Sequence, residues 1–193
     1  MKANILKIII QISSVAILAA VAGCKSQSLE ETYASLEESI DKYITSNFSD
    51  SSLYEVHRNK GSNRITVIPS DSVAAGLDMS DTLKAEGRVV FDYAFYIFDN
   101  SFPPRTMISS SLEDLATEGG IWTGDSTVFV PADVRLSGDE LLEGLKNGLL
   151  GVYAGEECYI VFSAQYGFGN KAVNAIPKMT SLMYHIWVHS IEN

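Results

Sequence analysis

Cysteine, histidine and basic residues are scarce in this chain. Its 193 residues include two cysteines, three histidines and 14 Lys plus Arg against 24 Asp plus Glu, so the formal net charge is −10. Nucleic-acid binding rests on the neutralisation of phosphates by Lys and Arg, and this balance argues against it. Electrostatic adhesion to an anionic lipid surface is disfavoured for the same reason.

Motifs for nucleophilic catalysis, phosphate binding and internal repetition are also missing from the sequence. His185 and His189 stand four residues apart on a predicted strand, roughly 13 Å at the rise of an extended chain, so they cannot share a metal ion. Cys158 alternates with Ile160 and Phe162 on another predicted strand. This pattern favours a buried core thiol. We therefore expect neither a metal site nor a cofactor.

One long apolar run is present, and it stands at the N-terminus. Lys2 and Lys7 begin it, residues 8–22 are largely apolar, and the sequence Val21-Ala22-Gly23-Cys24 follows. The run is shorter than the roughly 20 residues that a membrane span needs. The pattern resembles a bacterial lipoprotein signal, with an ordinary secretory signal or a transmembrane anchor as alternatives. We expect residues 1–23 to be the signal peptide and Cys24 to carry the lipid, on the outer membrane facing the periplasm.

The segment that follows a short tether has the spacing of an amphipathic helix. Acidic residues alternate with an apolar stripe, which consists of Leu29, Tyr33, Leu36, Ile40, Tyr43 and Ile44. The spacing predicts a helix that ends near Asn47. Its stripe can pack on its own domain or on a second copy, which would give a homodimer. Two short strands over 53–57 and 64–68 and a linking loop over 70–86 are expected next.

Residues 88–98 give the strongest β pattern in the chain. Phe91, Tyr93 and Phe95 share one face and Ala94 and Tyr96 the other, so both faces are apolar, as in a central strand. Capping-box patterns at 110–113 and 137–140 predict two further short helices, the first ending at 119–120. A strand is expected over 126–130.

The stretch 141–184 carries an ordered set of motifs. It contains Leu141-Leu142-Glu143-Gly144-Leu145, then Gly155-Glu156, Tyr166-Gly167 and Ile176-Pro177, and a closing strand begins at Leu182. This succession resembles the C-terminal half of the FKBP-type peptidyl-prolyl isomerases, and the likeness extends over about 88–191. It implies an α+β fold in which an antiparallel sheet wraps around a short helix, with the N-terminal amphipathic helix added. The expected organisation is a signal peptide (1–23), an N-terminal segment (24–87) and an FKBP-like domain (88–193).

The resemblance also implies an activity and a site. The chain would be a prolyl isomerase that assists the folding of envelope proteins and acts on proline-containing, unfolded or flexible polypeptides. The resemblance assigns catalytic positions to Tyr166, the backbone N–H of Leu142, and Ser109. The pocket walls would be Tyr93, Ile108, Val134, Leu141, Leu145, Ile176 and Tyr184, with the Leu142 side chain beside them.

Two departures from the family pattern bear on catalysis. Ser109 stands where the family has an aspartate, and Leu145 stands where it has a tryptophan. A smaller, less aromatic pocket leaves two alternatives open. One is an FKBP-like chaperone or binding module with little turnover, and the other is a structural envelope lipoprotein.

Overall fold

The computed structural model describes residues 28–138 and 141–193 and divides the chain into two units, Met1–Glu31 and Thr32–Asn193. The expected signal peptide (1–23) and Cys24 lie outside the described residues. Among the helices that are described, none is both long enough and apolar enough to cross a membrane. All the strands that the structure describes belong to the second unit.

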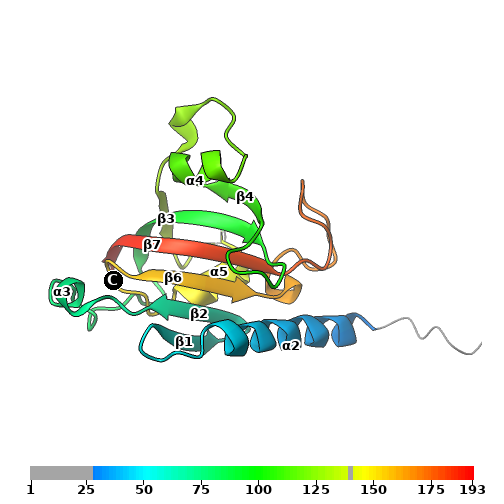
Figure 1. Cartoon of the computed structure of the whole chain (residues 1–193), viewed down its shortest axis with the longest axis horizontal. Coiled ribbons are helices and arrows are strands. Elements are labelled where there is room, and N and C mark those ends of the chain that lie inside the picture. Colours follow the sequence, from blue (N-terminus) through cyan, green and yellow to red (C-terminus); the bar gives the residue numbers. More distant parts are fainter. Residues whose placement is uncertain (1–27, 139–140) are drawn as a thin grey trace, which may run out of the picture. The chain divides into compact units, whose positions relative to one another are not determined.

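One antiparallel sheet organises the second unit (Figure 1). Its order in space is β1-β2-β6-β7-β3-β4, and β5 pairs with the part of the β3 edge that β4 leaves open. The expected α+β class is therefore confirmed. The strands are β1 (Tyr54–Asn59), β2 (Ser62–Val67), β3 (Arg88–Ile97), β4 (Thr106–Ser110), β5 (Ala132–Arg135), β6 (Glu157–Phe162) and β7 (Leu182–Glu192).

Strand β3 is central, as its sequence predicts. It pairs with β7 along its whole length. Phe91 and Phe95 point into one apolar cluster, while Tyr96 and Phe98 contact a second cluster on the opposite face. Because apolar side chains alternate to both faces, the strand must be covered on both.

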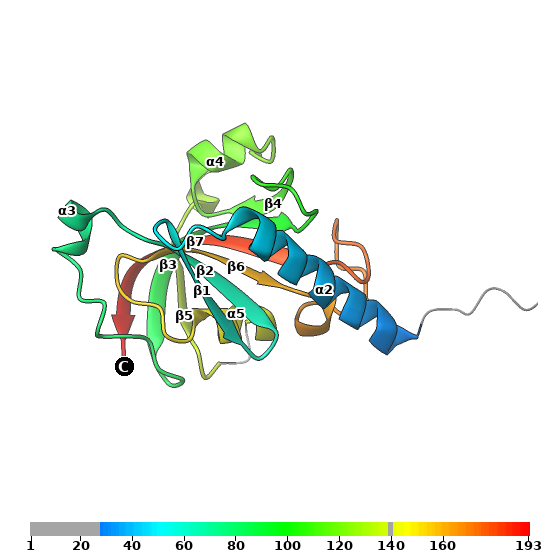
Figure 2. The ribbon, with the colours of Figure 1, turned by 60° about the horizontal axis from the view of Figure 1, so that its bottom comes forward.

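Two helices cover these two faces. Figures 1 and 2 show α2 (Leu29–Asn47) in front of the strands and α5 (Glu143–Leu149) behind them. The α2 side chains Ile40, Tyr43 and Ile44 are buried in the second cluster, so the expected apolar stripe packs within the chain. Ser28 and Glu31 exchange hydrogen bonds at the start of α2, which is a capping box.

The short helix α5 lies very close to the sheet, because two of its residues are glycines. A Cβ at Gly144 would overlap the ring of Phe162, and one at Gly148 would overlap Ile160. The apolar-apolar-x-Gly pattern that opens this helix is therefore a packing requirement, since only glycine lets helix and strand approach so closely.

Several local predictions are corrected by the structure. Residues 126–130 do not form a strand: Ser126–Val128 is a 3-10 turn, in which the Asp125 side chain accepts from the Thr127 N–H. Neither Ser110 nor Ser137, the first residue of each predicted capping box, is the N-cap of a described helix, and Asp139 and Glu140 of the second box lie outside the described residues. Helix α4 (Glu113–Glu118) has Leu112 at its N-cap, and α5 has Leu142.

The sheet also includes strands that precede residue 88. β1 and β2 confirm the two short strands expected from the sequence, with slightly different bounds. β2 pairs with β6, so residues 54–67 belong to the same sheet as the stretch that resembles the FKBP pattern. The expected linking loop over 70–86 contains a short helix, α3 (Asp71–Ala74).

Candidate functional site

The structure brings the predicted wall residues together on the α5 side of the sheet. Leu145 and Ile176 are buried in the first apolar cluster, each with 4% exposure. The other predicted residues are half-buried and pack against this cluster; they are Tyr93, Ile108, Val134, Leu141, Leu142, Tyr166 and Tyr184. They come from β3, β4, β5, the start of α5, the segment after β6, and β7. One apolar surface thus unites residues far apart in the sequence.

Tyr184 is the centre of an aromatic group on this surface. Its ring stacks on Phe95 with 4.4 Å between centroids, and the rings of Tyr93 and Phe162 each lie 6.2 Å away. Burial raises the pKa of the Tyr184 phenol well above its ordinary value, and nearby Tyr93 adds to the rise. The hydroxyl therefore stays neutral, and the surface is apolar and aromatic without being charged.

Strand β4 places Ile108 and Ser109 at the edge of this surface. Ser109 lies opposite Phe95 and Met107 lies opposite Tyr96, so Ile108 is the extra residue of a β-bulge. A bulge bends the strand locally and re-aims a side chain. Ile108 packs on the first cluster, and Ser109 is half-buried beside it.

The two serines that follow Ser109 hold β4 against β3. Ser110 Oγ donates to the carbonyl of Tyr93 at 3.0 Å. Ser111 Oγ accepts from the Tyr93 N–H at 2.8 Å and donates to Asp92 Oδ1 at 2.7 Å. These bonds fix the backbone of Tyr93, which is a predicted wall residue. The sequence predicted a helix-capping role for Ser110 and no role for Ser111.

Leu142 is the N-cap of α5, the position that the resemblance requires. Its backbone is extended (φ −58°, ψ 141°), and its carbonyl accepts from the Lys146 N–H at 2.9 Å. First-turn amides of a helix have no partner within the helix. A backbone donor at this place is therefore suited to a substrate carbonyl. Leu141, which precedes it, packs on the first cluster.

Tyr166 ends the 3-10 turn Ala164–Tyr166 and lies against the β1–β2 turn. A Cβ at Gly61 would overlap the Tyr166 ring, so the ring covers this glycine. Ile176 lies farther along the same loop and is fixed by two hydrogen bonds of 2.9 Å with Val173. The loop thus brings Ile176 to the cluster, and Tyr166 touches both the cluster and the β1–β2 turn.

Three phenylalanines belong to this surface without having been predicted as part of it. The rings of Phe95 and Phe162 stack with the Tyr184 ring, and Phe168 is half-buried against the same cluster. Phe95 could have been predicted from the sequence, because it stands two residues after Tyr93 and therefore on the same face of the strand. Phe168 stands between two glycines, two residues after Tyr166.

Charged groups cluster on the other side of the sheet. His185 Nε2 lies 2.8 Å from Glu157 Oε1, and His189 Nε2 lies 2.7 Å from Asp92 Oδ2. In residues 28–138 and 141–193, no group of three or more His, Cys, Asp or Glu side chains is placed to hold a metal ion. Cys158 is fully buried and unpaired, as predicted, and burial raises the pKa of its thiol.

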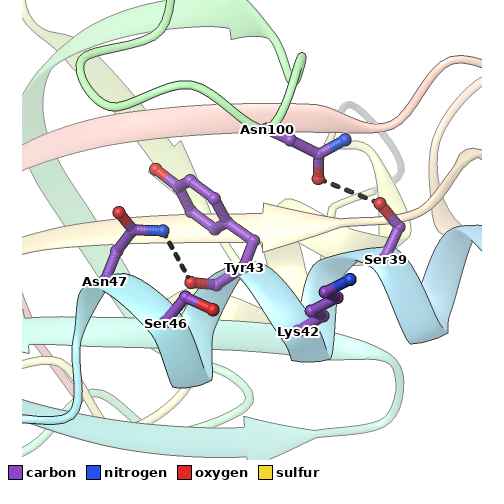
Figure 3. Close-up of a pocket in the computed structure, with 6 residues that line it drawn as sticks. All are labelled: Ser39, Lys42, Tyr43, Ser46, Asn47 and Asn100. Atoms are coloured by element: carbon purple, nitrogen blue, oxygen red, sulfur yellow. Dashed lines mark hydrogen bonds between the residues drawn. The ribbon is translucent and has the colours of Figure 1, made fainter.

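A polar hollow of about 340 Å³ lies on the α2 side (Figure 3). Ser39 Oγ donates to Asn100 Oδ1 at 2.9 Å across it, and Asn47 Nδ2 donates to the Tyr43 carbonyl at 2.9 Å. Lys42 and Ser46 complete the lining. These two hydrogen bonds link four of its six lining residues, and the hollow shares none of the predicted site residues.

Comparisons with known proteins agree with this arrangement. Residues 120–189 match the sequence profile of the family described as FKBP-type peptidyl-prolyl cis-trans isomerase. No curated protein sequence matches the chain. The matched segment contains β5, α5, β6 and most of β7, and therefore much of the apolar surface.

Three solved structures are similar in fold. The three FKBP domains of wheat FKBP73 give a TM-score of 0.51 at 11% identity, over 72% of this chain and 49% of the wheat chain. A peptidyl-prolyl cis-trans isomerase from Pseudomonas syringae gives 0.52 at 15% identity, over 84% of this chain and 96% of its own. FkpA from Escherichia coli gives a TM-score of 0.52 at 17% identity, over 95% of this chain and 71% of the FkpA chain. The fold is FKBP-like, and this chain spans about half the length of the wheat protein.

Proposed function

We propose that this chain is a peptidyl-prolyl cis-trans isomerase that acts on proline-containing, flexible or unfolded polypeptides. The observation that carries the proposal is the apolar surface around Tyr184. On it, residues from six separate segments pack over one cluster, and the FKBP-type profile covers much of the same region.

Prolyl isomerisation needs no nucleophile or cofactor. Its barrier of roughly 18–20 kcal/mol comes from amide resonance, which is lost when the C–N bond twists. The planar amide is more polar than the twisted one, so water favours the ground state. An apolar surface removes that preference and binds the twisted amide relatively better. Tyr93, Phe95 and Tyr184 would supply such a surface here.

Polar groups at the rim would orient the substrate. We assign the Leu142 N–H to one substrate carbonyl, because it lies at the start of α5. The Tyr166 hydroxyl would donate to another carbonyl, and Ser109 would occupy the place of the family's aspartate. Ile108, Val134, Leu141, Leu145 and Ile176 would contact the prolyl ring and its neighbours.

The test is isomerisation of a short proline peptide by purified residues 25–193. We expect catalysis above the buffer rate, inhibited by an apolar proline peptide in excess. A rate equal to that of buffer, with circular dichroism showing a folded protein, would contradict the enzyme proposal.

A second candidate is an FKBP-like binding module or chaperone with little turnover. Leu145 favours it, because this side chain is already buried in the core and offers no aromatic floor to a prolyl ring. The module would bind the same proline peptide without accelerating its isomerisation. Binding that is measurable by calorimetry in the absence of turnover would support this candidate, and absence of both would leave a structural envelope lipoprotein.

We further propose attachment to the bacterial envelope through lipid on Cys24. The support is the sequence Val21-Ala22-Gly23-Cys24 after an apolar run. Mass spectrometry of the mature N-terminus should show an acylated Cys24, and a free thiol there would contradict it. A homodimer through α2 stays a prediction, and it would have to use residues other than the buried Ile40, Tyr43 and Ile44. Sedimentation of the lipid-free chain measures it directly.

A further inference from the structure

A second cavity lies on the same face of the sheet as α5, but beside β1 and β2. Its volume is about 460 Å³, within the range of roughly 300–1,000 Å³ typical of ligand pockets. Strands β1 and β2, helix α3 and the turn between α5 and β6 line it. It shares no residue with the apolar surface around Tyr184.

A buried ion pair forms the floor of this cavity. Arg64 and Glu156 have side-chain exposures of 7% and 0%, and Arg64 Nε lies 3.3 Å from Glu156 Oε1. Thr66 Oγ1 donates to Glu156 Oε1 at 2.7 Å, and Arg64 Nη1 donates to the Leu150 carbonyl at 2.9 Å. Arg64 is therefore neutralised within the protein, and it leaves the floor without net charge.

The rim, by contrast, is acidic. Glu55 and Asp71 line the cavity and are exposed, and His57 Nε2 lies 3.6 Å from Glu55 Oε1. No lysine is among the lining residues that the structure describes. The accessible carboxylates of this cavity are thus Glu55 and Asp71, and they would attract a cation.

An apolar wall stands beside these acids. Ile68, Pro69, Ala74 and Met79 line the cavity, and Ile68 and Met79 keep 39% and 45% of their surface exposed. Lysine and arginine side chains combine an aliphatic stem with a charged end, and the stem packs readily on apolar surface. An apolar wall under an acidic rim is complementary to such a side chain.

We propose that this cavity is an accessory site for a lysine or arginine side chain of an extended polypeptide. The stem would lie on Ile68 and Met79, and the charged end would meet Glu55 and Asp71. The identity of the ligand as a polypeptide rests on the proposed function. The site itself would hold basic stretches of a client chain while its prolines reach the surface around Tyr184.

Proline-free peptides test this site without involving isomerisation. The probes are acetylated, amidated pentapeptides of alanine with a central lysine, norleucine or glutamate, titrated into the full chain and followed by backbone NMR shifts. We expect shifts at Thr66, Gly151 and Tyr153, and a lysine peptide that binds about five-fold more tightly than the norleucine one. The preference should shrink in 1 M salt, where the Debye length is about 3 Å.

A matched pair of variants locates the site. Ala74 lines the cavity, whereas its neighbour Ala75 is exposed and does not. Ala74→Trp should fill the cavity and weaken lysine-peptide binding by about ten-fold or more, because the site would be occluded. Ala75→Trp should leave binding within about two-fold, and Glu55→Gln should weaken it about two- to five-fold.

Other results would overturn the proposal. Equal affinity for the lysine and norleucine peptides would show that the site does not prefer a cationic side chain. An equal loss of affinity in both tryptophan variants would show that the peptide does not bind in this cavity. Shifts confined to the surface around Tyr184 would place the peptide elsewhere. Because the probes lack proline, their binding is measured separately from isomerisation. Loss of lysine-peptide binding with isomerisation intact would contradict only the accessory site, and lysine-peptide binding without isomerisation would contradict only the enzyme proposal.

Discussion

The two faces of the sheet are covered by helices of very different length. Helix α2 has 19 residues, and edge-to-face aromatic contacts lie on its side of the sheet, among them Tyr43–Phe98 at 4.8 Å and Phe48–Tyr54 at 4.9 Å between ring centroids. Helix α5 has seven residues and covers only the middle of its face. Around it, aromatic and aliphatic side chains stay half-buried.

This difference in cover suggests that the α2 side serves mainly the stability of the fold and that the α5 side is the one open to a ligand. The apolar stripe of the long helix buries the side chains of the second cluster, so α2 contributes mainly hydrophobic stabilisation. A short helix that sits close to the sheet leaves an apolar rim open, and an open apolar rim is what a prolyl ligand requires. We therefore expect variants on the α2 side to change folding, and variants of the half-buried side chains on the α5 side to change binding or turnover.

Removal of α2 should have the largest effect. A chain that begins at Asp50 loses Ile40, Tyr43 and Ile44 from the second cluster and uncovers Val161 and Met183. Burial of each large apolar side chain contributes about 1.5–3 kcal/mol. The total loss is comparable with the 5–15 kcal/mol that stabilises a typical domain. We expect unfolding or self-association, measured by thermal melting and sedimentation; an unchanged melt and mass would show that α2 is only a spacer.

On the α5 side, the contact of Gly144 with Phe162 should be the most sensitive point. Gly144→Ala places a methyl group inside the Phe162 ring, so helix and strand must separate. Such overpacking costs about 1–3 kcal/mol and should lower the melting temperature. Gly76→Ala is the control, because its Cβ would meet only the Val73 carbonyl oxygen at 3.6 Å. Equal melting temperatures for the two variants would show that α5 is not held as closely as described.

The elements with strict periodicity were predictable from the sequence. Residues 88–97 alternate apolar side chains to both faces, and β3 is accordingly buried on both. The stripe of α2 has the 3.6-residue spacing of a helix and ends at Asn47 as expected. In both cases the spacing of the apolar residues directly predicts which side chains are buried.

Short polar segments were not predictable, because tertiary contacts decide their hydrogen bonds. The sequence pattern at 110–113 predicts that Ser110 caps a helix, but its hydroxyl donates to the Tyr93 carbonyl on the neighbouring strand. Residues 126–130 have β-forming residues, yet the Asp125 side chain turns the chain back at Thr127. The contact of Tyr166 with Gly61 depends on the pairing of β2 with β6, which no local pattern reports.

Two tyrosines on neighbouring strands offer a test of the functional difference between the faces. Tyr184 stacks on Phe95 on the α5 side, and Tyr159 packs against the second cluster on the α2 side. Tyr184→Leu should lower kcat/KM for a proline peptide by about ten-fold, or about 1.4 kcal/mol of transition-state stabilisation. Tyr159→Leu should leave kcat/KM of the folded protein unchanged. An equal loss in both would show that activity merely follows stability.

The smallest expected effect concerns the part of the α2-side face that carries Glu157 and His185, whose side chains lie 2.8 Å apart. The hydrogen bond with His185 lowers the pKa of Glu157 below its ordinary value of 4.5. A lowered carboxyl pKa stabilises the fold at pH values above 4.5, and this stabilisation is lost as the pH falls through the lowered pKa. Because the Glu157 side chain is 42% exposed, water screens the pair and its contribution should stay below about 1 kcal/mol.

Glu157→Gln should therefore lower the melting temperature slightly at pH 7, and this deficit should shrink as the pH falls through the lowered pKa of Glu157. The control is Glu38→Gln, which removes an exposed acid from α2 and changes the overall charge equally. If the two variants have the same melting temperature at pH 7, the pair contributes nothing measurable. If the deficit of Glu157→Gln does not shrink as the pH is lowered, its cause is packing and not charge. Either result would show that the Glu157–His185 pair adds nothing to the hydrophobic stabilisation that α2 provides.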